Sequence, residues 1–359
     1  MSPNQRVQVT SLRAEPDPRR LARKDRPMKQ DSQPSNAERH QFTTFADARR
    51  IVEQFEDDLR SLGITISNGS ELELICAYVM DLESQKNGES TVTVNSDVRP
   101  LWRRAVGLMS LLDMLNHARQ RNQLSVFAPH LRILNAGSVS QNIRTSLTDD
   151  TCNKVFEMLI ALLCLPIAED VVLDHPQSSK GDNPDVLAKI DGTLWGFSCK
   201  TPQGTSPKSL FDRLKEGVDQ IENSPAQKGV VYFNFRNIID HDAVWPEVLR
   251  ETLPSDAPFT FRVWPDSSLV NEYYRNLVDA KNAEMLNAIG APFVQAIFKD
   301  KKSLPGAMVY LQSAAAFKTE HGQTIMSISF PAMMEFGTIP DQDYEVIRRI
   351  LRGITGTDK

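Results

Sequence analysis

The sequence has little of what several common kinds of site require. Its four cysteines include no pair at CxxC spacing, so we expect neither a disulfide framework nor a zinc ribbon, and a reducing compartment such as the cytoplasm is indicated. Its six histidines show neither HxxxH nor HExxH spacing, which argues against a zinc hydrolase. No glycine-rich phosphate loop is present. The longest nearly apolar run, residues 158–168, is too short to span a bilayer, and the first 30 residues have no apolar stretch typical of a signal peptide.

What the sequence does have is charge that is distributed unevenly, within a net formal charge of −5. Residues 1–40 hold nine basic and five acidic side chains, five prolines and almost no large apolar residues, which predicts a disordered basic tail. This tail could contact nucleic acid or another acidic surface, or it could simply be solvated.

Residues 97–144 hold seven arginines against two aspartates, and they contain neither lysine nor glutamate. Arginine favours bidentate contacts with phosphate, so this stretch is a candidate nucleic-acid interface. The alternative is a helical scaffold with solvated arginines. The candidate contacts are Arg99, Arg103, Arg104, Arg119 and Arg121.

A strongly apolar segment over residues 148–165 predicts a buried helix that contains a single carboxylate, Glu157. A buried carboxylate is costly without a partner. We therefore expect Glu157 either to reach a cation or a metal, or to lie at the edge of the helix in water.

A predicted hairpin follows, over residues 184–200. Asp191-Gly192 separates two runs typical of strands, which is a strong signal for a two-residue turn. That turn would pair Ile190 with Thr193 and would place Asp185 opposite Ser198, with Lys200 one diagonal step away. Alternation then puts an acid, a hydroxyl and an amine at the end of the hairpin that lies away from its turn. Its other face is apolar and includes Cys199.

Such a cluster could hold a hard divalent cation. Mg²⁺ prefers a few carboxylates, backbone oxygens and water, and Mn²⁺ could substitute for it. Asp185 and Glu157 would be the metal ligands, with the backbone carbonyl of Cys199 as a further ligand. Lys200 would orient a water or stabilise charge on a phosphate. The alternative is a surface Asp–Lys pair of little energetic value.

The order of these elements resembles the PD-(D/E)xK nuclease superfamily, which has the restriction-endonuclease-like fold. Pro184-Asp185 resembles its "PD", Lys200 its lysine, and Glu157 lies where many members carry a helical acid. A helix starting near Ser206 and a strand over residues 229–235 also follow the family order. The resemblance covers about 85 to 90 of the 359 residues. It implies a Mg²⁺-dependent nuclease acting on DNA in preference to RNA, with restriction or defence as a compatible role and a homodimer left open.

One residue departs from the family pattern, because Ser198 stands where an acid is usual. Ser198 would then hydrogen-bond a metal-bound water, and Glu157, Asp174 or Asp182 would supply the missing charge. The alternatives are a degenerate nuclease fold that binds nucleic acid or a protein without cutting, and a scaffold for protein interactions alone. Gln220 lies on the following helix, where some family members carry a functional glutamine, but the match is imprecise and a solvated helix face is the preferred interpretation.

The predicted fold class is therefore α/β, with a central mixed β-sheet flanked by helices. We expect the disordered tail over residues 1–40, a mainly helical N-terminal region over residues 41–145 and a nuclease-like domain with a C-terminal extension over residues 146–359. In that extension, helices are predicted over residues 245–253, 268–289 and 344–354. Strands are predicted over residues 292–299, 307–317 and 324–330.

Overall fold

The computed structural model of the chain describes residues 41–86, 97, 99–146, 149–177, 183–245, 259–263, 269–319 and 322–355. The predicted tail over residues 1–40 and the predicted extended segment over residues 90–95 lie outside these described residues. Residues 39–359 form one compact unit. Within the part that is described, no helix is both long and apolar enough to cross a membrane.

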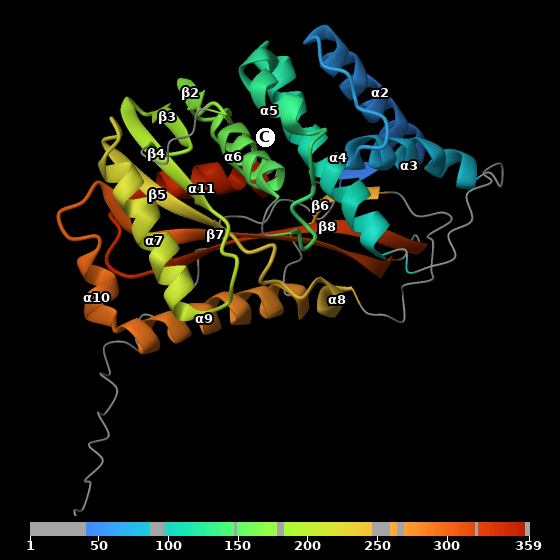
Figure 1. Cartoon of the computed structure of the whole chain (residues 1–359). Helices are drawn as coiled ribbons and strands as arrows, with labels where there is room; N and C mark the ends of the chain where they lie inside the picture. Colours follow the sequence, from blue (N-terminus) through green and yellow to red (C-terminus); the bar gives the residue numbers. More distant parts are fainter. Residues whose placement is uncertain are drawn as a thin grey trace, which may run out of the picture. The chain divides into compact units, whose positions relative to one another are not determined.

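A mixed, open β-sheet lies at the centre of this unit (Figure 1). In spatial order, its eight described strands are β1 (Gln41–Thr43), β6 (Phe259–Val263), β8 (Gly322–Glu335), β7 (Ser303–Thr319), β5 (Lys228–Asn234), β4 (Thr193–Lys200), β3 (Val186–Ile190) and β2 (Asp170–Leu173). The pairs β4–β5, β5–β7 and β6–β8 are parallel, and the others are antiparallel. The predicted α/β class with a mixed sheet is confirmed.

Helices cover both faces of this sheet (Figure 1). In chain order, the longer helices are α2 (Phe45–Ser61), α3 (Glu71–Lys86), α4 (Arg99–Gln120), α6 (Asp150–Cys164), α7 (Pro207–Glu222), α9 (Leu269–Ile289) and α11 (Asp341–Thr355). The shorter ones are the 3₁₀-helix η2 (Leu124–Phe127), α5 (Ala128–Ile133), α8 (His241–Val244) and α10 (Ala291–Ala296).

The helices α6 and α7 lie on opposite faces of the sheet. The rings of Phe156 in α6 and Tyr310 in β7 lie 5.7 Å apart, and Tyr310 shares its face with Tyr232 in β5. On the other face, α7 approaches so closely that a Cβ added to Gly217 would lie 2.8 Å from Val231 of β5. Any site at the end of β4 therefore lies between side chains from two different layers.

The predicted hairpin register is confirmed. Asp191 and Gly192 both have positive φ, at 49° and 74°, as a two-residue type I′ turn requires. Ile190 pairs with Thr193, and Val186 pairs with Phe197. Most residues of the predicted apolar face are fully buried. The register consequently carries Asp185, just before β3, to the end of the hairpin where β4 finishes.

The helices on either side of the hairpin also follow the sequence prediction. Asp149 caps α6 by accepting the amide hydrogen of Cys152, and nearly every side chain of this helix is buried. Ser206 caps α7 in the same way, with Pro207 in its first turn.

One prediction in the C-terminal part is wrong. Residues 292–299 were expected to form a strand, but residues 291–296 form α10, which starts after Gly290 at a positive φ of 94°. A short apolar run does not distinguish strand from helix by periodicity. Of the helix predicted over residues 245–253, only Trp245 lies among the described residues, as the C-cap of α8.

Candidate active site

Asp185 is buried at the open end of the β3–β4 hairpin, with 5 % of its surface exposed. Its Oδ2 accepts the backbone N–H of Cys199 at 2.6 Å, and its carbonyl oxygen accepts the backbone N–H of Asp174. The carboxylate is thus fixed against the last residues of β4. The backbone of Cys199, the predicted carbonyl ligand, lies directly beside it.

Glu157 enters the site from α6 and is also buried, at 5 % exposure. Lys154, one turn earlier, donates to both of its carboxylate oxygens at 2.8 and 2.9 Å. His130 of α5 is buried with its Nε2 4.0 Å from Glu157 Oε2, and burial next to Lys154 lowers the pKa of His130 to about 4. Of the two outcomes predicted for Glu157, burial beside a cation is the one observed.

The two carboxylates influence each other. Burial, followed by the charge of Glu157, raises the pKa of Asp185 to about 7. Burial also raises the pKa of Glu157, although Lys154 opposes this shift. Two buried acids that are both disfavoured as anions are stabilised by any cation that comes to lie between them.

Lys200 ends β4 and points toward α7. Its Nζ donates to Gln220 Oε1 at 2.6 Å and lies 3.2 Å from Glu216 Oε1. The hydroxyl of Ser198, which is fully buried, donates to the same Gln220 oxygen at 2.6 Å. Ser198 and Lys200 therefore share one acceptor on α7.

Gln220 corrects the interpretation drawn from the sequence. Its side chain does not lie on a solvated helix face, because it is buried and contacts both Ser198 and Lys200. Glu216 and Lys154 were not anticipated either. Gln220 follows Gly217 by three residues, so both lie on the helix face that packs closely on β4 and β5.

The site is built from both sides of the sheet. Glu157 belongs to the helix on the Tyr232 face, whereas Gln220 and Glu216 belong to the helix on the Val231 face. Asp185 lies between them at the end of the hairpin. This arrangement accounts for a further finding: in the described residues, no group of three or more His, Cys, Asp or Glu side chains is arranged to hold a metal ion.

Of the two aspartates proposed as substitutes for Ser198, Asp174 lies next to this site. Asp174 is partly buried after β2, and its backbone is joined to Asp185. Asp182 lies outside the described residues.

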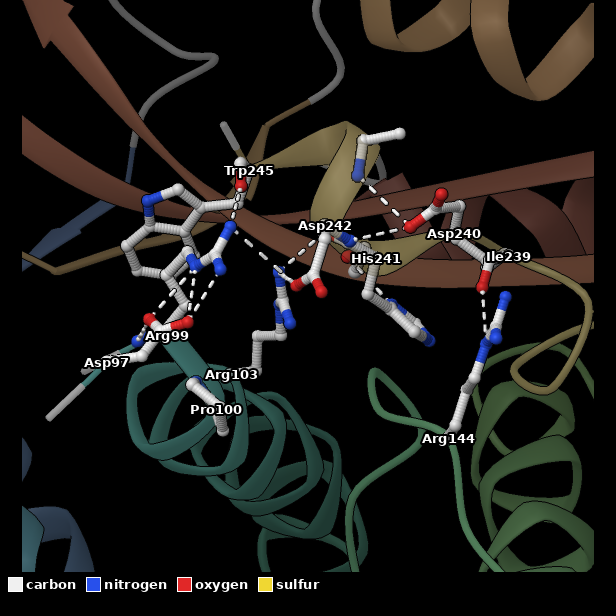
Figure 2. Close-up of polar contacts among 12 residues, drawn as sticks. Asp97, Arg99, Pro100, Arg103, Arg144, Ile239, Asp240, His241, Asp242 and Trp245 are labelled. Carbon is white, nitrogen blue, oxygen red and sulfur yellow. Dashed lines mark hydrogen bonds and ion pairs between the residues drawn. The ribbon is translucent and has the colours of Figure 1, made fainter. Parts of the chain in front are cut away.

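Two of the arginines predicted to contact nucleic acid are buried in the protein instead (Figure 2). Arg99 donates to the carboxylate of Asp97 and to the carbonyl of Trp245. Arg103 donates to the carbonyl of His241 at 2.6 Å and to Asp242 at 2.8 Å. Both guanidinium groups join the start of α4 to α8, which corrects the expectation that they are free for phosphate.

Of the other three arginines, Arg104 and Arg119 are partly buried and Arg121 is exposed, and all three also have internal partners. Arg119 binds Asp58 of α2, and Arg121 donates to the carbonyl of Leu165. Arg104 lies 3.6 Å from Glu71 of α3. These contacts tie the N-terminal helices together and leave less positive charge for a polyanion than the composition indicates.

The comparisons with known proteins add no relative to this description. No family model, no curated protein and no solved structure matches the chain. The assignment of a function therefore rests on the geometry of the site and on the sequence motif.

Proposed function

We propose that this protein is a metal-dependent nuclease that hydrolyses phosphodiester bonds in nucleic acid, DNA in preference to RNA. The observation that carries the proposal is the pair of buried acids, Asp185 and Glu157, at the end of β4 beside Lys200. Burial of two neighbouring carboxylates is unfavourable, and Lys154 donates to Glu157 alone. The raised pKa of each acid supports a position for a further cation beside them.

The residues present fit Mg²⁺ or Mn²⁺. Mg²⁺ is commonly held by one or two carboxylates, with waters and substrate phosphates completing its octahedron, so a cluster of three protein acids is not required. Asp185 and Glu157 would hold the ion, and the carbonyl of Cys199, whose backbone N–H is bonded to Asp185, would be a further ligand. When bound, the ion would polarise a phosphoryl oxygen and lower the pKa of a bound water.

Lys200 would stabilise the negative charge that develops on the phosphate. Its contacts with Gln220 and Glu216 hold the ammonium at the end of β4. The role of Ser198 is then to orient Gln220. This replaces the predicted hydrogen bond from Ser198 to a metal-bound water, since its hydroxyl proton is directed to Gln220.

The arrangement of the chain gives further support. A helix with an acid, a strand, the Pro184-Asp185 hairpin, a helix and a parallel strand follow in the order of the restriction-endonuclease-like fold. In this chain these elements are α6, β2, β3, β4, α7 and β5, with β4 parallel to β5.

Cleavage of plasmid DNA by the purified chain tests the proposal. We expect nicking with Mg²⁺, none with a chelator, and a loss of at least about 100-fold in Lys200→Met and Asp185→Asn. Lys208→Met, which removes an exposed lysine at the start of α7, should cleave normally. Full activity in either site variant would refute the assignment.

A second function is favoured by one observation. Lys200 and Ser198 are both directed to Gln220, and the described acids do not form a three-ligand group, which also suits a fold that binds nucleic acid without cutting it. Calorimetric titration with Mg²⁺ and Mn²⁺ separates the two. Absence of metal binding, together with salt-sensitive binding of DNA, would favour the binding module.

A further inference from the structure

A second buried cation lies close to the candidate active site. Arg236 follows β5 and has 1 % of its surface exposed. Its Nε donates to Thr145 Oγ1 at 3.1 Å, its Nη1 to Thr201 Oγ1 at 3.2 Å, and its Nη2 to Asn153 Oδ1 at 3.0 Å. All three acceptors are neutral, and all three belong to partly exposed residues.

The charge of Arg236 is not balanced locally. Within the described part of the chain it forms no ion pair, and Asp149, the carboxylate that acts on it from a distance, is engaged by the amides of Ser138 and Cys152. A guanidinium group has five N–H donors, and these three bonds use three of them. One donor on each terminal nitrogen therefore has no acceptor among the described residues.

A buried, unpaired charge is costly, and an arriving anion relieves that cost. The two remaining donors belong to the two terminal nitrogens of one planar fork, which matches two oxygens of a phosphate. The hydroxyls of Thr145 and Thr201 accept from Arg236, so each keeps its own proton to donate to such an anion.

The position of Arg236 connects it with Asp185 and Glu157. Arg236 and Thr201 follow the carboxyl ends of the parallel strands β5 and β4, the edge at which α/β sheets bind ligands. Thr201 comes directly after Lys200. Asn153 is four residues before Glu157 on one face of α6, which corresponds to about 6 Å along the helix axis.

We propose that Arg236, with Thr145 and Thr201, binds a backbone phosphate of the nucleic-acid substrate next to the phosphate that is cleaved. This inference rests on the proposed function for the identity of the substrate. In it, Asp185, Glu157 and Lys200 act on one phosphate, while Arg236 holds its neighbour and sets the position of the strand.

Binding without cleavage tests this proposal. The probe is a fluorescent single-stranded deoxyoligonucleotide of twelve nucleotides, titrated by anisotropy at several salt concentrations in the presence of a chelator. The parent protein is Asp185→Asn, which cannot assemble the proposed metal site. Arg236→Gln removes the charge, Arg236→Lys keeps it without the fork, and Arg349→Gln is the matched control. Arg349 pairs with Asp191 at the turn, the opposite end of the hairpin.

We expect Arg236→Gln to weaken binding about tenfold or more and to reduce the slope of log K against log salt by about 0.7, the value for one phosphate contact on a single strand. Arg236→Lys should weaken binding with the slope unchanged, because it keeps the charge but cannot form the bidentate contact. Arg349→Gln should change neither quantity. Thermal melting shows which variants are folded, and Arg236→Lys alone decides the question if Arg236→Gln does not fold.

If Arg236 only joins four segments of the fold, its variants melt at lower temperature but bind with the affinity and slope of the parent, and the proposal is overturned. Plasmid cleavage by the wild-type chain is scored separately. If cleavage is lost in Asp185→Asn but the affinity for the oligonucleotide does not change in the Arg236 variants, this inference is contradicted and the nuclease assignment stands. If binding depends on Arg236 but the wild-type chain does not cleave, the phosphate contact is supported and the nuclease assignment is contradicted.

Discussion

Replacing Asp185 with asparagine should make the protein more stable and inactive at the same time. Asparagine is nearly isosteric, and its Oδ1 can still accept the Cys199 amide that Asp185 accepts at 2.6 Å. What it removes is a buried negative charge next to Glu157. The substitution therefore separates the electrostatic cost of the site from its packing.

The magnitude follows from the pKa of Asp185, which burial raises from its ordinary value of 3.8 to about 7. A carboxyl group whose folded pKa is raised contributes full stability below 3.8 and loses it as the pH rises through 7. At pH 8 the difference amounts to on the order of 4 kcal/mol, which is an upper figure for the gain in Asp185→Asn. At pH 5 the folded protein has already taken up the proton, so the gain should be less than half as large.

Urea unfolding at pH 8 and pH 5, in the presence of a chelator, measures both gains. Asp212→Asn, an exposed aspartate on α7, is the control and should change stability by less than about 0.5 kcal/mol at either pH. Added Mg²⁺ should stabilise the wild type but not Asp185→Asn, because only the wild type keeps both proposed ligands. A loss of stability in Asp185→Asn at pH 8, or a gain that is equal at both pH values, would contradict the reasoning.

Three further predictions concern groups around the site. Gln220→Leu removes an acceptor of buried Lys200, so the free energy of unfolding, measured in urea, should fall by about 1 to 3 kcal/mol. DNA cleavage should fall in the same variant. Gln220→Glu keeps an acceptor and should retain the fold. Burial lowers the pKa of His241 from about 6.5 to about 4, so the neutral imidazole contributes stability above pH 6.5 that is lost as the pH falls toward 4. Between pH 7 and pH 5, the wild type should therefore lose about 2 kcal/mol more of its free energy of unfolding than His241→Gln does, as measured by urea unfolding at each pH. Arg103→Met should destabilise the protein by about 2 kcal/mol, because it removes the donor to the buried His241 carbonyl and the partner of Asp242, yet leave the salt dependence of oligonucleotide binding unchanged.

The parts of the fold that the sequence predicts well are those set by neighbouring residues. Asp191 and Gly192 can both adopt positive φ, and that local property determines the pairing of every residue in the hairpin. The apolar residues around Glu157 likewise predict a buried helix, although they leave the position of the carboxylate itself open. The sequence does not indicate strand β6, because its pairing partners β1 and β8 are distant in the chain and nothing in its own five residues requires them.

The candidate site was predicted less completely, because its partners come from other elements. Gln220 is 22 residues from Ser198, and whether it faces water depends on how α7 packs, which Gly217 indicates only weakly. The internal partners of the arginines are likewise not visible in the sequence. Composition reveals the charge of these arginines, but it does not show that the guanidinium groups of Arg99 and Arg103 donate to backbone carbonyls that lie 146 and 138 residues away.

The contact between α11 and the hairpin turn bears on how the protein folds. A two-residue turn closes a very small loop, so the β3–β4 register can form within microseconds, before most of the chain is ordered. The ion pair from Arg349 to Asp191 joins residues separated by 158 positions, and the bond from Lys228 to Asp343 spans 115. Contacts of such long range form late, because their loop-closure entropy is not offset until the intervening strands are in place. We therefore expect the hairpin that carries Asp185 and Lys200 to be among the first parts to order, and its enclosure by α11 to be the slow step of folding.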